Sequence, residues 1–176
     1  MDEWYCPFIF INEMDNRFKD PKIQVMETPF YRMHLEKFWE EIYSTEITTG
    51  GEDIFVERTV RVEEASLSGS EAVEESRDRD GNVWITGVER ERGELKGVRL
   101  SWHIIAKMRA DQGRDESGEM DRDVRVEKLF KNNGIGKKFV CLVIVERYVL
   151  KRMDGSVMLT YSFTHCDQLK GKWGFK

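Results

Sequence analysis

The stretch KKFVCLVIVERYVLKRMDGSVMLTYSFTHCDQL, Lys137–Leu169, decides the fold. Two runs rich in β-branched and aromatic residues, Phe139–Arg152 and Val157–Leu169, flank the short segment Met153–Ser156. Asp154-Gly155 lies at its centre, and Asp-Gly between two such runs predicts a two-residue β-hairpin loop with a type I′ turn. The stretch therefore predicts a long antiparallel hairpin.

A two-residue loop also fixes which side chains of the hairpin face each other. It places Tyr148 opposite Tyr161 and Leu150 opposite Leu159. The face that carries the aromatic side chains is the expected core face. The other face, rich in Thr, Ser and Arg, is expected to be half solvated.

This register places Glu146 on the aromatic face, diagonal to His165, and diagonal neighbours lie about 7–8 Å apart. An acid beside a histidine in a partly dry setting is typical of general acid–base chemistry. Glu146 and His165 are therefore candidate catalytic residues at a pocket mouth, where Tyr148, Tyr161 and Asp167 are candidate ligand-binding residues. In the alternative interpretation, Glu146 and His165 form a structural pair at the rim of the sheet or point to water.

Other segments predict further strands and loops. Alternation of apolar and polar residues, or a high content of strand-forming residue types, predicts strands over four segments: Trp4–Asn12, Ile54–Val62, Asn82–Arg90 and Asp123–Phe130. The charged, Gly-containing segments 66–81 and 111–121 are expected to be exposed loops, and 132–136 a Gly-rich turn.

Helices are expected in three places. One begins at Lys22, after Asp20-Pro21, and ends before Pro29. Another covers His34–Tyr43, where apolar residues recur at helical spacing: Leu35, Phe38, Trp39 and Ile42. The third covers Leu100–Gln112, with Gly113 as its stop.

Several strands in succession, without an alternating βαβ order, indicate one α+β domain over residues 1–176. It is expected to contain a largely antiparallel sheet with a long C-terminal hairpin and two or three helices packed on it.

Composition excludes some classes of function. The 176-residue chain has 28 basic and 33 acidic residues and a net charge of −5, so no nucleic acid is expected as a partner. Its first residues lack a positively charged region before an apolar stretch, so no secretory signal is expected. The apolar runs are too short for a transmembrane segment.

The three cysteines, Cys6, Cys141 and Cys166, show no C-x-x-C spacing. This favours a reduced intracellular, cytoplasmic protein.

Metal and cofactor motifs are also missing from the sequence. The three histidines, His34, His103 and His165, do not fall at i, i+4 spacing, so no metal site is predicted. The segment 134–137, Gly-Ile-Gly-Lys, lacks the full spacing of a phosphate-binding loop and precedes a predicted strand. No cofactor is therefore expected.

Two blocks of sequence carry a family resemblance. The first comprises Trp4–Phe10, Phe30-Tyr31 and Leu35–Glu40, and the second comprises Val145–Ser156, Leu159–His165 and Lys172-Trp173. Together they resemble the C-terminal portion of the plant family catalogued as domain of unknown function 1262. The resemblance implies a plant source, an α+β domain, and a shortened member or fragment. Where the family reads His-Thr-His, this chain has His165-Cys166-Asp167.

The family brings no known activity, and the sequence contains no nucleophile–base motif. The preferred hypothesis is therefore a non-catalytic intracellular binding protein, with another protein as its partner. One alternative is an enzyme or small-molecule binder that uses Glu146 and His165. A third interpretation takes the long strands as membrane-active or toxin-like.

Overall fold

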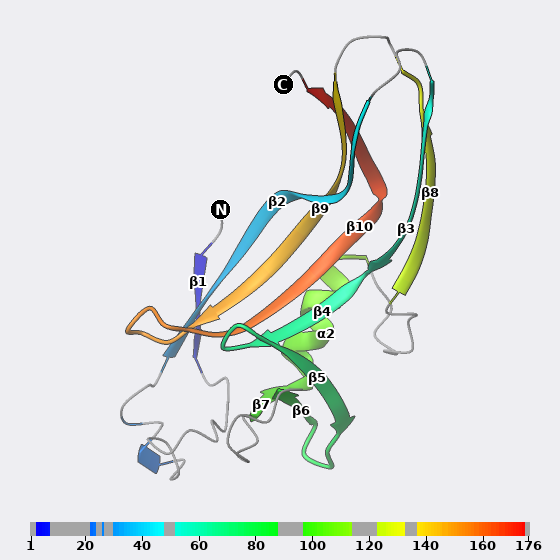
Figure 1. Ribbon diagram of the computed structural model, residues 1–176. Helices are drawn as coiled ribbons and strands as arrows, with labels where there is room; N and C mark the ends of the chain where they lie inside the picture. Colours follow the sequence, from blue (N-terminus) through cyan, green and yellow to red (C-terminus); the bar gives the residue numbers. More distant parts are fainter. Residues whose placement is uncertain are drawn as a thin grey trace. The chain divides into compact units, whose positions relative to one another are not determined.

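The computed structural model describes residues 3–7, 22–23, 26, 30–47, 52–87, 97–113, 123–132 and 137–174 (Figure 1). The strands are β1 Glu3–Pro7, β2 Phe30–Glu46, β3 Ile54–Arg61, β4 Glu63–Leu67, β5 Ser70–Arg77, β6 Asn82–Gly87, β7 Gly97–Ser101, β8 Asp123–Phe130, β9 Lys138–Lys151 and β10 Val157–Gly174. The helix α2 spans Trp102–Asp111.

Antiparallel β-structure dominates the described residues, so the predicted α+β class with two or three packed helices is wrong. Within those residues α2 is the one continuous helix, besides helical positions at Lys22, Ile23 and Met26. The helix expected to begin at Lys22 otherwise lies outside the described residues, as do most of the expected loop 111–121 and turn 132–136.

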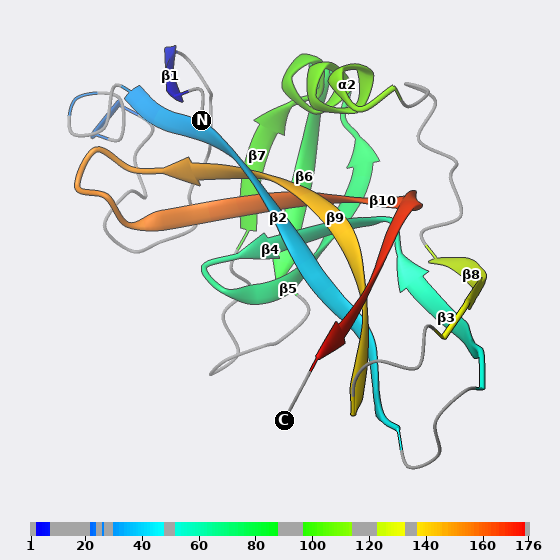
Figure 2. The same ribbon diagram turned by 90° about the horizontal axis from the view of Figure 1, so that it is seen from above.

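The strands form two sheets (Figures 1 and 2). The larger sheet has the order β1-β2-β9-β10-β4-β5-β6-β7, and the smaller is the pair β3-β8. The pairs β1–β2, β3–β8, β4–β5, β5–β6 and β6–β7 are antiparallel. The strands predicted over Ile54–Val62 and Asp123–Phe130 are confirmed, and their pairing as β3 and β8 adds what sequence alone did not show.

The chain divides into two compact units. The first unit comprises Met1–Glu36, Glu64–Glu119 and Arg147–Tyr161. The second unit comprises Lys37–Glu63, Met120–Glu146 and Ser162–Lys176. Each of the long strands β2, β9 and β10 contributes residues to both units.

The predicted helix over His34–Tyr43 is wrong, because this segment lies inside the seventeen-residue strand β2. Its apolar residues match a helical stripe, yet Phe38 is half-buried and Trp39 is exposed, as neighbouring residues of a strand are. β2 is hydrogen-bonded between β1 and β9. Pairing on both sides outweighs the local helical pattern, because aromatic and β-branched residues also suit a pleated sheet.

The exposed loop predicted over 66–81 is also wrong, because it contains most of the hairpin formed by β4 and β5. Ser68 and Gly69 connect the two strands, and Leu67 pairs with Ser70. Their φ angles of 50° and 91° are both positive. This is the signature of a type I′ turn, so the turn type that was predicted for the C-terminal hairpin occurs here instead.

The long C-terminal hairpin is confirmed as β9 and β10, but its turn differs from the predicted one. The Arg152 amide donates to the Ser156 carbonyl at 2.9 Å, and the Gly155 amide donates to the Arg152 carbonyl at 2.9 Å. Gly155 has a φ of 87°, whereas Asp154 has no positive φ. The loop therefore has three residues, a type I turn followed by a glycine bulge, and pairing next to it is one residue out from the predicted register.

Both faces of the hairpin's central part are buried, so the expected half-solvated face is wrong there. Val143, Val145 and Thr164 lie on that face and are all buried.

The first unit has a core in which β6, β7 and α2 bury five apolar side chains almost completely: Val83, Ile85, Val98, Leu100 and Ile105. Leu100 ends up in β7, because α2 begins two residues later than predicted.

The second unit has its core between the β3–β8 pair and strand β9. Val56, Phe139 and Cys141 are fully buried there, with Phe130 and Trp173 packed against them. The Phe139 ring centroid lies 5.1 Å from that of Phe130 and 4.7 Å from that of Trp173. Burial also raises the pKa of the Cys141 thiol, which keeps it a neutral core residue.

Gly171 allows these rings to approach β10. A Cβ atom there would lie 2.8 Å from Phe130 Cδ1 and 2.9 Å from Phe139 Cε2. Gly171→Ala is therefore expected to lower the free energy of unfolding by about 1–3 kcal/mol, because packed rings must shift. Urea denaturation measures this. Gly174→Ala is the matched control, since its new Cβ meets only Lys138 O at 3.9 Å; equal effects of the two substitutions would contradict the explanation.

Candidate functional site

Three neighbouring strands bring together Lys37 of β2, Glu146 of β9 and His165 of β10 in the second unit. Lys37 Nζ donates to Glu146 Oε1 at 2.7 Å. Glu146 Oε2 lies 3.9 Å from His165 Nε2, a distance beyond hydrogen bonding. The Glu146 and His165 side chains are 15% and 20% exposed. The two candidate catalytic residues are thus close, but the carboxylate also makes a short contact with a lysine that the sequence analysis did not consider.

Glu146→Gln is expected to lower the free energy of unfolding by less than about 1 kcal/mol. Its lysine partner is mostly exposed, and ion pairs of this kind contribute little because water screens them. Thermal denaturation at low and high salt measures the effect, which should shrink as salt rises. A loss of several kcal/mol that is insensitive to salt would contradict this reading.

The candidate ligand-binding residues Tyr148 and Tyr161 lie in the first unit, whereas Asp167 is an exposed residue of the second unit. The hydroxyl of Tyr161 donates to Glu74 Oε2 at 2.8 Å and accepts from Arg109 Nη2 at 3.1 Å. The hydroxyl of Tyr148 accepts from Gln112 Nε2 at 3.3 Å. Both tyrosine hydroxyls are thus engaged by side chains from the helix α2 or its C-terminal end.

Glu74, Arg109 and Tyr161 form a buried polar network that the sequence analysis missed. Arg109 Nη2 donates to Glu74 Oε2 at 2.8 Å, and the Arg109 guanidinium lies 5.4 Å from the centre of the Trp102 ring. Glu74 belongs to a segment that had been predicted as a loop, so its sequence gave no sign of a core partner. The network joins β5, α2 and β10, and it stabilises the position of the helix on the sheet.

The remaining histidines, His34 and His103, lie on β2 and α2. His34 Nε2 lies 3.0 Å from Glu36 Oε1, and His103 is an exposed residue of α2. Among the residues that the structure describes, no group of three or more His, Cys, Asp and Glu side chains is arranged to hold a metal ion.

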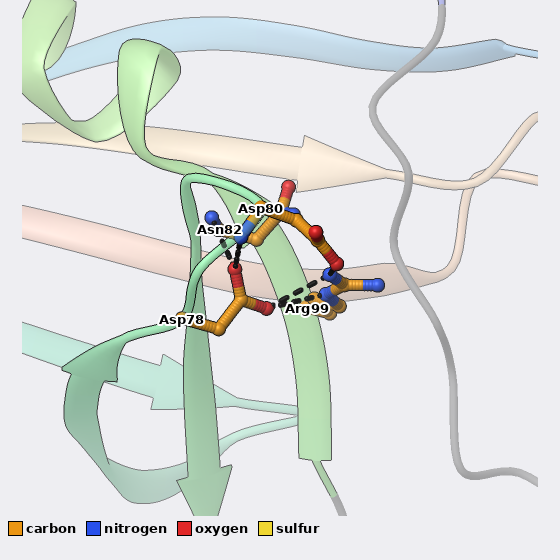
Figure 3. A network of polar contacts seen from close by, with 4 residues as sticks. All are labelled: Asp78, Asp80, Asn82 and Arg99. Atoms are coloured by element: carbon orange, nitrogen blue, oxygen red, sulfur yellow. Dashed lines mark hydrogen bonds and ion pairs between the residues drawn. The ribbon is translucent and has the colours of Figure 1, made fainter.

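A second polar cluster closes the turn between β5 and β6 (Figure 3). Asp78 Oδ1 accepts from the backbone amides of Asp80 and Asn82, both at 2.9 Å. Arg99 of β7 donates through Nε to Asp78 Oδ2 at 2.9 Å and through Nη2 to Asp80 Oδ2 at 2.8 Å. The figure shows the guanidinium between the two carboxylates. Every member has a partner within the cluster, so the arrangement serves the turn.

This turn makes stability depend on pH. The backbone amide of Asn82, together with Arg99, holds the pKa of Asp78 below its ordinary value of 3.8. A lowered folded-state pKa means that Asp78 stabilises the fold above the unfolded-state value and loses this contribution as pH falls through the folded-state value. The Tm of Asp78→Asn is thus expected to lie below that of the unchanged chain at pH 7, with the difference closing below pH 3.8. A constant difference between pH 7 and pH 2 would contradict this.

Two large apolar side chains, Phe55 and Leu129, are exposed on one face of the β3–β8 pair in the second unit. We call this face the outward face. Phe55 and Leu129 are directly paired across the two strands. Phe55 is 53% exposed and Leu129 is 56% exposed, whereas the large apolar side chains that form the core are buried. Ile54 is half-buried and Val56 is buried, so the outward position of Phe55 between them follows from the alternation of side chains along a strand.

A hollow of about 270 Å³ lies beside this pair, still within the second unit. Its described lining comes from the end of β2 and the beginning of β3: Tyr43, Thr45, Glu46, Ile47, Glu52, Asp53, Ile54 and Phe55. The lining thus combines two aromatic rings with three carboxylates. It includes neither Glu146 nor His165.

Comparisons with known proteins give little further information. A scan against models of protein families finds no match, and a search of curated proteins finds none either. The solved structure described as "Crystal structure of Cry35Ab1" is similar, with a TM-score of 0.46 and 12% sequence identity. The similarity covers 98% of this chain and 45% of that one. Among the described residues, no helix combines the length and apolar character that crossing a lipid bilayer requires.

Proposed function

We propose that this protein is a non-catalytic binding protein that docks a segment of another protein on the outward face of β3–β8. The observation that carries the proposal is the exposed cross-strand pair Phe55–Leu129. Two large apolar side chains that water can reach gain free energy when a partner covers them, about 1.5–3 kcal/mol for each side chain fully buried. Aromatic side chains are also enriched where binding energy concentrates.

Charge indicates what kind of segment fits this face. Glu52 and Asp53 precede Phe55 in the chain, and both are exposed. The next pair on the outward face of the two strands is Glu57–Glu127. The guanidinium of Arg125 pairs with both carboxylates: Nη2 lies 2.6 Å from Glu57 Oε1, and Nε lies 2.7 Å from Glu127 Oε1. These four exposed carboxylates stand against two exposed basic residues in corresponding positions, Arg125 and Lys131, so negative charge is in excess beside the apolar pair. A partner segment with an apolar side chain flanked by lysine or arginine complements it.

A displayed library of random twelve-residue peptides tests this proposal directly. Peptides selected on the full chain should carry Leu, Phe or Trp next to Lys or Arg. Phe55→Ser should weaken their binding about tenfold or more, since one buried Phe contributes at least the 1.4 kcal/mol that corresponds to tenfold affinity. Val73→Ser is the matched control, because Val73 is an exposed apolar residue of β5 in the other unit.

The outcome that would overturn the proposal is equally definite. If no peptide is enriched, or if Phe55→Ser and Val73→Ser affect the enriched peptides equally, the Phe55–Leu129 face is not the docking site. Leu129→Ser provides a second variant on the same face. It should weaken the same peptides, because Leu129 and Phe55 are directly opposite.

The alternative, an enzyme or small-molecule binder built on Glu146 and His165, has one supporting observation. The two side chains lie 3.9 Å apart and are largely buried. Against it, Lys37 already engages the carboxylate at 2.7 Å, and the described hollow lies at other residues. This alternative predicts that a ligand bound at the site shifts the ring resonances of His165 in NMR spectra. Those shifts should disappear in Glu146→Gln.

We further propose an intracellular, reducing environment and kinship with the plant family named above. Two free thiols support the first of these: Cys141 is buried and Cys166 is half-buried. Alkylation under denaturing conditions without a reductant, followed by mass spectrometry of the protein from its natural source, should label both cysteines. Oxidised cysteines would instead indicate a secreted protein.

A further inference from the structure

We propose, building on the docking function above, that the hollow beside Phe55 is a socket for one lysine or arginine side chain of the partner segment. The outward face of β3–β8, which we also call the docking face, supplies apolar contact with the partner segment, whereas the hollow binds its positively charged side chain. The inference thus names the residue type that the partner must place next to its apolar side chain.

The chemistry of the lining supports a cationic occupant. Among its described residues are three carboxylates, from Glu46, Glu52 and Asp53, and no lysine or arginine. One oxygen of Asp53 already accepts from the Asn132 amide at 2.9 Å, which fixes that carboxylate at the rim. A charged side chain entering the hollow therefore meets negative charge that is held in place before binding.

The aromatic residues favour the same occupant. A cation over the face of a Tyr or Phe ring is attracted by the ring's electrons. The Tyr43 ring already attracts a cation of the chain itself, because the Arg58 guanidinium lies 5.0 Å from its centre. Phe55, the other ring of the lining, is more than half exposed and remains accessible to a partner.

The size of the hollow suits a single side chain. Its volume is about 270 Å³. One water molecule needs only about 10–15 Å³ of such volume, so the space exceeds what a few ordered waters fill. The extended end of one lysine or arginine fits, whereas a whole folded element does not. The socket is therefore expected to select a residue type and not a particular fold.

Two small probes test the socket without any library peptide. N-acetyl-arginine methylamide is titrated into the full chain, and its neutral citrulline analogue serves as the matched probe of nearly the same shape. In NMR spectra the arginine probe should shift the resonances of Phe55 and Glu52 in a saturable way. Its apparent affinity should be about five- to tenfold higher than that of the citrulline probe.

Variants decide whether the carboxylates are responsible. Glu52→Gln should remove most of the preference for arginine over citrulline, whereas Glu71→Gln, an exposed position of β5, should leave it unchanged. Equal affinity of the two probes, or an unchanged preference in Glu52→Gln, would overturn the socket. Those results would not affect the proposed docking face if Phe55→Ser still weakens the binding of the library peptides. Loss of that dependence, with the arginine preference intact, would instead overturn the docking face alone.

Discussion

Phe139→Ala is expected to lower the free energy of unfolding by about 3–5 kcal/mol. Phe139 is fully buried in the core of the second unit, and its ring packs against those of Phe130 and Trp173. Truncation removes the apolar contacts of the whole ring and leaves a cavity, because the neighbouring rings and the adjacent strand limit how far the site can collapse. Urea denaturation followed by tryptophan fluorescence measures the loss.

Two further variants keep this prediction testable. Phe55→Ala removes the same atoms from an exposed position, so it is expected to cost about 0.5 kcal/mol or less. Phe139→Leu retains much of the volume and is expected to cost less than about 1.5 kcal/mol, which makes it useful if Phe139→Ala does not fold. Similar losses in Phe139→Ala and Phe55→Ala would show that the Phe139 core contributes little.

Arg109→Ala is expected to cost about 3–5 kcal/mol, because it leaves the Glu74 carboxylate largely buried without its guanidinium partner. The substitution also removes the contact of the guanidinium with the Trp102 ring and its hydrogen bond to the Tyr161 hydroxyl. Chemical denaturation measures the free energy, and far-UV circular dichroism reports whether the helix α2 is retained.

The control for this prediction lies on the same helix. Lys107 is exposed and pairs with Asp111, so Lys107→Ala should leave the unfolding midpoint nearly unchanged. The double variant Glu74→Leu/Arg109→Met should recover much of the loss, since an apolar pair of similar volume needs no charge partner. If Arg109→Ala proved as mild as Lys107→Ala, the network would not hold α2 in place.

The sequence was most informative where strands alternate or consist of β-branched residues. The hairpin β9–β10 and the strands β3 and β8 lie close to where pattern alone put them. The turn type at Asp154-Gly155 was missed because Asp-Gly is compatible with two geometries. A type I′ turn needs positive φ at both residues, whereas a type I turn with a glycine bulge needs it only at Gly155. Choosing between them requires hydrogen bonds that the sequence does not specify.

The failure at β2 has a different physical origin. Leu35, Phe38, Trp39 and Ile42 match a helical period, and local propensity alone would accept a helix there. The segment is a strand because β1 and β9 hydrogen-bond to it on either side, and those partners are distant in the chain. Residues that serve a paired strand need not alternate strictly when both faces are partly covered.

The candidate site was only partly within reach of sequence reasoning. The hairpin led to the prediction that Glu146 and His165 lie near each other, and they are 3.9 Å apart, but Lys37 belongs to a strand that had been predicted as a helix. The Glu74–Tyr161 hydrogen bond joins residues 87 positions apart, across a segment that had been predicted as a loop. Contacts at such separation depend on the order of strands in the sheet, which no local pattern encodes.

The division of β2, β9 and β10 between the two units has a consequence for how this chain tolerates rearrangement. Each unit is assembled from three separate stretches of sequence, so no contiguous fragment consists of one unit alone. Excising or grafting one unit by itself would sever backbone hydrogen-bond ladders in three strands at once. Insertions and new termini should instead be accepted at the exposed tip 153–155 of the β9–β10 hairpin, where the backbone reverses at the surface and no strand-to-strand ladder is interrupted.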